Sequence, residues 1–482
     1  MSGKAEMEPP ESARDEDGSQ EETKERRRKE RALLCRLDFF IVPVLMVLQL
    51  ISYLDRGNIG FAATQGMAQD IHLKGNQLNT VVSVFYVFYI LTEFPAALLV
   101  KRLQFNRAIP TIAACWGLTC LFTGFIQSFD SLIITRILLG AFEGCLFPCI
   151  TLCLCNWYKR EELGVRIALL LVASALAGAF GGFLAWAVLH LDGVSNMPGW
   201  RWLYIIEGLI TVVWAGLCVI LIPRNYETAY FLNDEQKTLM RKRAEEMEVY
   251  NGGSGHYTKE DIKEAAKDVK SWMHGLTQIG ISTILFGFGT FLPIIIKDGF
   301  QFSTVQAQYF VIPVNLWGSI VYVIGAILSD KYSSRFLPLA ICAPFGMIGY
   351  AILLCDVSPG VRYFATYLIS IPCFLCSGAN TTWLSVNCAP DGKRAASLGI
   401  HLTLSNIGGV IAGQIYQSSS APAFTLGHAW SLGSLSIAWF GWWIIWMMYK
   451  RRQSSKDKLI TEGSTIVEGT FTDRAPEFKY QT

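Results

Sequence analysis

The stretch LIITRILLGAFEGCLFPCITLCLC, residues 132–155, is apolar along nearly its whole length but carries Arg136 and Glu143. An α-helix needs about 20 apolar residues to cross the hydrocarbon core of a bilayer, so this stretch is long enough. Eleven more stretches of the same kind lie at 37–54, 78–100, 108–127, 167–189, 202–222, 272–296, 306–328, 336–355, 363–383, 395–416 and 429–449. The sequence therefore predicts an all-α membrane protein with 12 transmembrane helices.

The composition of the whole chain agrees with this prediction. Of the 482 residues, 52% are hydrophobic and only 17% are charged, against about 25% charged in soluble domains. The charges are also concentrated, because residues 1–31, 224–270 and 450–482 hold 49 of the 80 Asp, Glu, Lys and Arg residues. The remaining residues carry too few charges to form the surface of a water-soluble protein.

The hydrophilic stretches divide the chain into regions. We expect a disordered cytoplasmic tail over 1–31, an N-terminal six-helix bundle over 32–223, a cytoplasmic central loop over 224–270, a C-terminal six-helix bundle over 271–449 and a cytoplasmic tail over 450–482. The tails are polar and lack the apolar residues that ordering requires, so we expect both to be disordered. Two bundles facing each other suit an alternating-access carrier, whose substrate site lies between them near the midplane.

Basic residues in the short connections orient the chain. With both termini in the cytoplasm, the short cytoplasmic turns hold ten Lys and Arg residues and the external connections hold four. Positive residues favour the cytoplasmic side, so we expect both termini there, in the plasma membrane. Two of these turns occupy equivalent places in the two halves, with Lys101 and Arg102 in one and Asp330, Lys331 and Arg335 in the other.

Several other classes of function find no support. The net charge of +2 and the lack of a basic segment with interleaved aromatic residues argue against nucleic-acid binding. Cys373 and Cys376 have neither a second pair nor a nearby His, so we expect no metal site. No Gly-x-Ser-x-Gly or His-Glu-x-x-His motif occurs, so we expect no membrane-embedded enzyme.

Charged residues inside the spans are the candidates for function. An ionisable side chain deep in a span costs roughly 2.5–3.5 kcal/mol on insertion scales, so it needs a partner or a function. The first half holds Asp55 and Arg56 at the end of the first span, Glu93 in the second, and Arg136 and Glu143 in the fourth. The second half offers only two histidines in its spans. We therefore expect the chemistry to lie in the N-terminal bundle.

Arg136 and Glu143 are seven residues apart, which is close to two helical turns, so they project from the same face of their helix. The rise of about 10.5 Å between them is too long for an ion pair within the helix. Each must find its partner on another helix or on a ligand, and Gly140 between them allows another helix to approach closely. One hypothesis is a buried ion-pair network that only holds helices together. The other is that arginines bind an anion while carboxylates carry a proton.

Further polar residues in the spans have both structural and functional interpretations. Tyr53 and Tyr89 are expected to hydrogen-bond a substrate carboxylate, although tyrosines in spans also serve packing. Asn380 belongs to an unusually polar tenth span and is expected to line a cavity. In the eleventh span, His401 is a candidate contact for the substrate or the proton, although a structural role is favoured for it. Asn406 in the same span is the stronger candidate for a substrate contact.

Four motifs follow one another along the chain. They are Tyr53-Leu-Asp-Arg-Gly-Asn-Ile-Gly, Arg136-Ile-Leu-Leu-Gly-Ala-Phe-Glu-Gly, Gly199-Trp-Arg-Trp-Leu-Tyr-Ile-Ile-Glu-Gly and Ser405-Asn-Ile-Gly-Gly. With these motifs the chain resembles the major facilitator superfamily and, within it, the allantoate permease-like branch of the anion:cation symporter family. The similarity covers about residues 35–450.

This resemblance implies the major facilitator fold and a carrier of small organic anions or vitamins. It implies proton coupling at Asp55 and Glu143 and anion binding at Arg56, with Arg136 organising their electrostatics. It also implies gating by the two equivalent turns, with Lys101 and Arg102 in one and Asp330, Lys331 and Arg335 in the other, although Lys101-Arg102 departs from the superfamily's signature because the acidic residue is missing. The full set of expected substrate-binding residues is Arg56, Arg136, Tyr53, Tyr89, Asn406, Asn380 and His401.

We therefore expect a secondary active transporter that takes up a small organic anion with protons, nicotinate-like carboxylates being favoured. The coupling proton is the only cofactor expected. The expected partners are the anionic substrate and the lipid bilayer, with no nucleic acid, and the carrier is expected to be a monomer. An exporter of an acidic metabolite and a non-transporting sensor are the alternatives.

Overall fold

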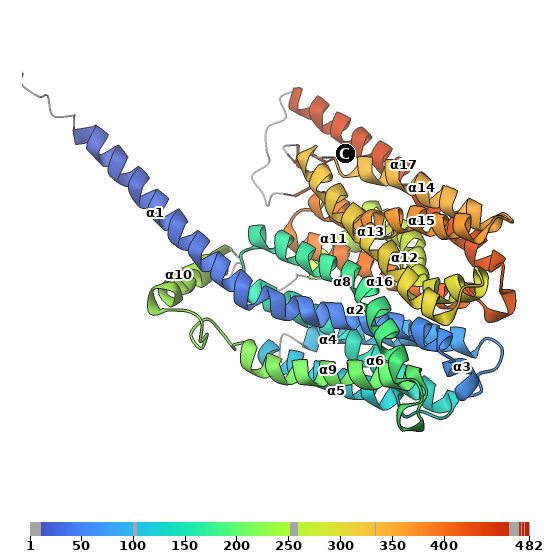
Figure 1. Cartoon of the computed structure of the whole chain (residues 1–482). Coiled ribbons are helices and arrows are strands. Elements are labelled where there is room, and N and C mark those ends of the chain that lie inside the picture. Colours follow the sequence, from blue (N-terminus) through green and yellow to red (C-terminus); the bar gives the residue numbers. More distant parts are fainter. Residues whose placement is uncertain are drawn as a thin grey trace, which may run out of the picture.

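The computed structural model describes residues 11–99, 104–250, 259–332, 334–461, 472–473, 475–476 and 478–481, and all the regular structure within these ranges is helical. Helices of the first and second halves of the chain occupy opposite sides of the molecule, and a long N-terminal helix projects away from both (Figure 1).

The N-terminal bundle is built from helices that match the first six predicted spans. These are α2 (Val42–Thr64), α4 (Gln77–Leu99), α5 (Phe105–Thr123), α6 (Phe129–Gly144) continued by α7 (Leu146–Trp157), α8 (Arg160–Val188) and α9 (Gly199–Leu221). The short helix α3 (Met67–Asp70) and two 3₁₀ turns (Leu189–Leu191 and Val194–Asn196) lie in the connections at one end. Within this bundle α4 packs against α6, and α5 packs against α9.

The C-terminal bundle repeats the plan. Its helices are α12 (Val269–Ile294), which ends in a π-helical turn (Ile295–Gly299), α13 (Thr304–Lys331), α14 (Phe336–Leu354), α15 (Pro359–Val386), α16 (Asp391–Ile415) and α17 (Thr425–Thr461), with a 3₁₀ turn at Ser418–Ser420. The central loop contains α10 (Asp234–Tyr250) and α11 (Lys259–Lys267). The halves meet where α2 packs on α12, α4 on α16 and α8 on α13.

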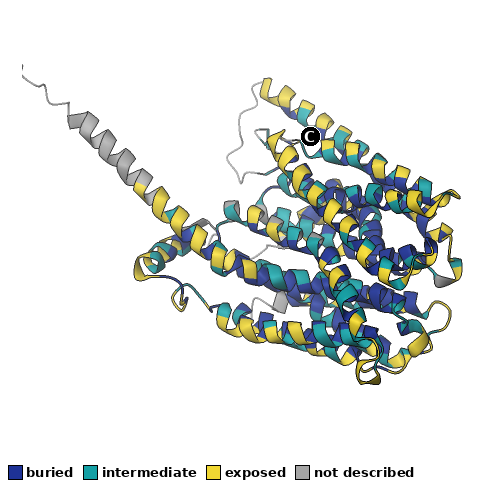
Figure 2. Ribbon diagram, viewed as in Figure 1, coloured by how far each residue is buried: buried dark blue, intermediate teal, exposed yellow. Residues whose placement is uncertain are grey.

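The surface of the bundles is that of a membrane protein. By length and composition, ten of the described helical stretches suit a membrane crossing, and α4 and α5 fill the two other predicted places. Large apolar side chains such as Ile220, Ile437 and Phe440 are more than half exposed on the outer faces (Figure 2). In water such patches would drive aggregation, whereas in lipid they are the expected covering. The predicted all-α membrane fold is confirmed.

The first span is longer than predicted. The sequence places its end at residue 54, but α2 continues to Thr64, so Asp55 and Arg56 lie well inside the helix. The prediction ended the span at the first charges. The helix passes through them because both side chains find polar partners inside the bundle, so neither charge has to face lipid.

The N-terminal tail also differs from expectation. Residues 11–31, expected to be disordered, are the first part of the helix α1 (Glu11–Phe40), and residues 1–10 lie outside the described part of the chain. Lys29 pairs with Glu25 one turn earlier at 3.1 Å and with Glu235 of α10 at 3.0 Å. Pairs of this kind support a helix that has little apolar surface.

The bonds between the two halves gather at the end where α2 finishes and α4 begins. Gln308 Nε2 donates to Thr64 Oγ1 at 2.7 Å, and Lys297 Nζ donates to the carbonyl of Thr64. Asn79 Nδ2 donates to the carbonyls of Gly413 and Tyr416 at 2.7 and 2.8 Å. These bonds hold that end of the two bundles together.

The second tail is partly ordered, contrary to expectation. Helix α17 runs on to Thr461, and the described residues near the C-terminus lie against the C-terminal bundle. The carbonyl of Gln481 accepts hydrogen bonds from Trp383 Nε1 at 2.8 Å and from Asn387 Nδ2 at 3.0 Å. The Asp473 carboxylate lies between Lys270 and Lys393, with Lys393 Nζ at 3.0 Å. Ordering is possible because the tail supplies a counter-charge to two buried lysines.

Asp268 also belongs to this cluster, and it lies 3.5 Å from Arg452 Nη1 as well as near both lysines. Its carboxylate is 2.8 Å from Lys393 Nζ and 3.5 Å from Lys270 Nζ. Burial alone would raise the pKa of Asp268, but Lys270 and Lys393 outweigh that effect and lower it to about 2. Because its pKa is lowered, the Asp268 carboxylate stabilises the fold at pH values above the ordinary pKa of Asp. This contribution is lost as the pH falls from that value through about 2. At neutral pH the two lysines therefore face two carboxylates.

Replacing Asp473 by Asn is expected to destabilise the C-terminal bundle. Two buried lysines and Arg452 would then share the one carboxylate of Asp268, and breaking a buried pair costs about 3 kcal/mol or more. We expect a clearly lower melting temperature for the purified protein. Asp457→Asn, on the exposed face of α17, is the matched control. Equal melting temperatures for the two variants would show that the tail does not contribute to stability.

Candidate functional site

A buried ion pair joins α2 to α6. Arg56 Nε donates to Glu143 Oε2 at 2.9 Å, and the two side chains are 9% and 0% exposed. Arg56 Nη2 also donates to Ser52 Oγ, one turn earlier, at 3.3 Å. The sequence predicted that Glu143 would find its partner on another helix or a ligand, and the structure identifies that partner as Arg56.

Aromatic rings surround the Arg56 guanidinium. Its central carbon lies 4.6 Å from the ring centre of Tyr53, 4.7 Å from that of Tyr89 and 5.9 Å from that of Phe85. Such contacts attract a cation to the face of a ring, and they orient the planar guanidinium. The predicted grouping of Tyr53 and Tyr89 with the charged residues is therefore present.

Asp55 belongs to a different group of side chains from its neighbour Arg56. It accepts hydrogen bonds from Trp116 Nε1 and from Cys120 Sγ, the latter at 3.2 Å, both on α5. Asn58 Nδ2, one turn further along α2, lies 3.3 Å from Asp55 Oδ1 and also donates to Glu207 Oε2 of α9. Successive residues of a helix point about 100° apart, so Asp55 and Arg56 face different neighbours.

Glu207 was missed by the sequence reasoning, although it stands inside the predicted sixth span. Its side chain is 2% exposed. A count of ionisable residues in every span would have found it, but nothing in its sequence spacing indicates that it meets Asp55. Trp116, Cys120 and Asn58 were missed for the same reason, since their roles arise only from packing between helices.

Arg136 lies on the other side of this group. Its Nη2 donates to the Tyr204 hydroxyl of α9 at 2.6 Å, and its positive charge acts on the Asp55 carboxylate. Arg136 and Glu143 thus have separate partners on other helices, as their spacing predicted. In the described part of the chain the cluster contains buried polar atoms without a hydrogen-bond partner, namely Arg136 Nε, Glu143 Oε1, Asn58 Oδ1 and Glu207 Oε1.

These unpartnered atoms bear on the choice between a structural and a functional network. Buried polar groups in proteins are nearly always satisfied, and a half-satisfied network stabilises a fold poorly. The four atoms, on Arg136, Glu143, Glu207 and Asn58, have no protein partner among the described residues and can take a hydrogen bond from water or a ligand.

Two glycines let α4 approach α6 beside the ion pair. A Cβ on Gly140 would lie 2.3 Å from the carbonyl oxygen of Phe85, and one on Gly144 would lie 2.5 Å from that of Tyr89. These contacts are with backbone atoms, which cannot move aside like a flexible side chain. The close approach predicted at Gly140 is therefore present, and it brings Tyr89 of α4 next to Arg56.

Gly140→Val is expected to separate α4 from α6. Overpacking of this kind costs typically 1–3 kcal/mol, and here it also displaces Tyr89 from Arg56. We expect a lower melting temperature and weaker substrate binding in the same variant. Gly216→Val on α9 is the control, because nothing lies within 4 Å of a Cβ at that position. If both variants melted alike, close packing at Gly140 would have no role.

The three expected substrate-binding residues of the C-terminal bundle have hydrogen-bond partners other than Arg56 and Glu143. Asn380 is fully buried and bonds His274 and Gln278, so it lies in a polar network within the bundle. His401 is also fully buried and bonds Thr381 through Nε2 at 3.0 Å. Asn406 does reach the other half, where its Nδ2 donates to Glu93 Oε2 of α4 at 2.9 Å.

The predicted gating residues are described only in the second half. Lys101 and Arg102 lie outside the described residues. In the turn after α13, Arg335 Nη1 lies 2.5 Å from Asp330 Oδ1 and 3.2 Å from Ser329 Oγ, while Lys331 lies over the ring of Tyr332. The turn is thus stabilised by an ion pair of its own.

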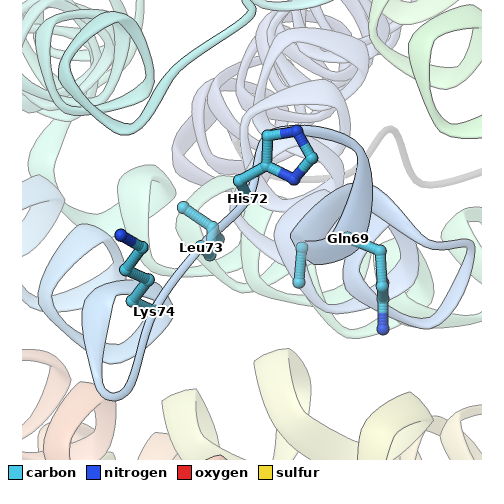
Figure 3. Close-up of a pocket in the computed structure, with 5 residues that line it drawn as sticks. Gln69, His72, Leu73 and Lys74 are labelled. Atoms are coloured by element: carbon cyan, nitrogen blue, oxygen red, sulfur yellow. The ribbon is translucent and has the colours of Figure 1, made fainter.

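A surface hollow lies apart from this cluster. It is lined by Ala68, Gln69, His72, Leu73 and Lys74, around the end of α3 (Figure 3). None of the charged residues of the cluster lines it, and it is widely open to solvent. We do not assign the substrate site to this hollow.

The fold and the buried charged cluster define a class of protein, a helical membrane carrier. Residues 45–413 match the Major Facilitator Superfamily. The chain belongs to that superfamily. It is therefore a membrane transporter that moves a small molecule, and not an enzyme.

Relatives of known sequence support this membership. An uncharacterised transporter of Schizosaccharomyces pombe is 40% identical over 452 residues, which cover 93% of this chain and 90% of that protein. The high-affinity nicotinic acid transporter of Saccharomyces cerevisiae is 32% identical over 458 residues, which cover 94% and 85%.

Solved structures share the fold. A bacterial homologue of the human lysosomal transporter Spinster, in an inward-facing and unoccupied conformation, has a TM-score of 0.66 at 14% identity and covers 84% of this chain and 96% of that one. The D-xylose–proton symporter has a TM-score of 0.65 at 11% identity, with 85% and 97% covered.

Proposed function

We propose that this transporter takes up a small organic anion together with protons, within the allantoate permease-like branch of the anion:cation symporter family. Nicotinate-like monocarboxylates are the favoured substrates. The 32% identity to the yeast nicotinic acid transporter over most of both chains supports this choice. We place the protein in the plasma membrane as a monomer, with both termini in the cytoplasm.

The observation that carries the proposal is the Arg56–Glu143 ion pair. A substrate carboxylate and the Glu143 carboxylate compete for the same guanidinium, because Glu143 occupies Arg56 Nε at 2.9 Å. Protonation of Glu143 removes its charge and frees Arg56 for the substrate, which an arginine holds with two parallel bonds. Binding of the anion and binding of the proton thereby favour each other. The rings of Tyr53 and Tyr89 suit a flat aromatic carboxylate beside the guanidinium.

Release follows from movement of the two bundles. The bonds from Thr64 and Asn79 to the C-terminal half close one end of the molecule. With the termini in the cytoplasm, the closed end is the external one, and the opposite end is the route of release. Asn406 and Glu93 lie where the bundles meet and are proposed to sense the substrate between them. The Asp330–Arg335 turn is proposed to take part in gating the cytoplasmic end.

Uptake into proteoliposomes tests this function. We expect labelled nicotinate to accumulate when a proton gradient is imposed in the inward direction, and not when it is absent. Accumulation that ignores the gradient would contradict proton coupling. Transport driven only by the opposite gradient would favour an exporter, and binding without any flux would favour a sensor.

A further inference from the structure

We propose that Glu207 carries a coupling proton of this transporter, with the adjacent Asp55 remaining a carboxylate. This inference rests on the proton-coupled transport proposed above, and it moves one of the two proton sites from Asp55 to a residue of α9. The second proton site stays at Glu143.

The two carboxyl groups form one unit. Asn58 Nδ2 contacts both Asp55 Oδ1 and Glu207 Oε2, so the two carboxyl groups share one amide nitrogen. Two ionised carboxylates held this close in a dry interior repel each other, and this favours a proton on one of them. Both side chains are nearly inaccessible, at 1% and 2% exposed. The pair therefore holds a proton in this conformation.

The hydrogen-bond donors decide which member holds it. Asp55 accepts from Trp116 Nε1, Cys120 Sγ and Asn58 Nδ2, and it is further stabilised as a charge by Arg136. Glu207 accepts from Asn58 alone, and its Oε1 has no partner. Among the described residues no Lys or Arg forms an ion pair with Glu207. Donors favour the ionised form and burial penalises it, so the proton belongs on Glu207.

The surroundings allow this proton to be exchanged. The other titratable and charged groups that face the pair are Cys120 of α5, Arg136 and Glu143 of α6, and Tyr204 of α9. Arg136 is the only cation among them, and it is hydrogen-bonded to Tyr204. Loss of the proton leaves two carboxylates near one guanidinium, which requires water or a change in the position of Arg136. Opening of the bundle during the transport cycle provides such a change.

The pair and the Arg56–Glu143 site share α2 and the charge of Arg136 but have different hydrogen-bond partners. Arg56 and Glu143 link α2 to α6, whereas Asp55 and Glu207 link α2 to α9. Each site binds one proton when the carrier is loaded. The transporter therefore moves two protons with each anion, one on Glu143 and one on Glu207.

Proton counting separates Glu207 from Asp55. In proteoliposomes, the reversal potential of labelled nicotinate transport gives the number of protons per anion. We expect two for the wild type, one for Glu207→Gln and two for Asp55→Asn, which transports more slowly. Glu227→Gln, an exposed loop carboxylate paired with Arg241, is the control and keeps two. A count that falls in Asp55→Asn and is unchanged in Glu207→Gln would overturn the proposal.

Infrared spectra of the purified protein give a second measurement that does not depend on transport. In a Glu143→Gln background, which removes the other proposed proton site, we expect a band from a protonated carboxyl group that titrates between acidic and alkaline buffer, and we expect it to persist when Asp55→Asn is added. The band is expected to be absent when Glu207→Gln is added instead. Should Glu207→Gln fail to fold, loss of the band in Asp55→Asn would overturn the proposal and its persistence would support it. If wild-type uptake ignores the proton gradient, the proposed function fails, whereas the spectra still decide whether Glu207 titrates.

Discussion

Arg56→Ala is expected to lose substrate binding and transport together. The variant removes the cation that we propose binds the carboxylate, and it leaves Glu143 buried without a counter-charge. Truncating one partner of a buried, hydrogen-bonded charge pair costs about 3 kcal/mol or more, which corresponds to roughly a hundredfold in Kd. Thermal stabilisation of the purified protein by nicotinate and related carboxylates measures this loss, since a ligand stabilises the folded protein only if it binds.

Two further variants make this result specific. Arg56→Lys keeps the positive charge but loses the planar guanidinium fork, so we expect an intermediate affinity. Arg241→Ala removes an exposed arginine of α10 that makes only a 3.7 Å contact with Glu227, and it should bind like the wild type. If Arg56→Ala were stabilised by carboxylates as well as Arg241→Ala is, the anion site would lie elsewhere.

The membrane-spanning helices could be predicted from the sequence because lipid imposes one simple requirement on each of them. A span needs a long apolar run, and the predicted start of α4 at residue 78 differs from the observed start at Gln77 by a single residue. The error at α2 has the same origin. Apolar character marks the part of a helix that faces lipid. It therefore does not predict where a helix ends when the helix carries charges toward other helices.

Part of the site could be predicted in its members, but Glu207 and the pairings could not. The spacing of Arg136 and Glu143 showed that each needs a partner elsewhere, yet only the contacts of α6 with α2 and α9 reveal that the partners are Tyr204 and Arg56. Asn380 shows the opposite case. A polar residue in a span is compatible with a cavity wall or with a satisfied internal network, and the position of His274 and Gln278 on α12 decides for the network.

Glu143→Gln is expected to uncouple transport from the proton gradient. Glutamine has the shape of a protonated glutamate, so Arg56 is released permanently and the anion no longer requires a proton to bind. A gradient of one pH unit is worth about 1.4 kcal/mol per proton, which drives roughly tenfold accumulation. We expect the variant to lose the accumulation contributed by this proton while exchange of labelled for unlabelled anion persists in part.

Comparing accumulation with exchange in the same proteoliposomes tests this prediction. The two activities should separate in Glu143→Gln, because exchange needs only that the loaded carrier reorient, whereas accumulation also needs the proton to be carried. Glu162→Gln removes a carboxylate that pairs with Arg243 outside the cluster, and it should preserve the ratio of the two activities. Equal loss of both activities in Glu143→Gln would instead assign Glu143 to holding α6 against α2, because a structural ion pair has no means of distinguishing exchange from net transport.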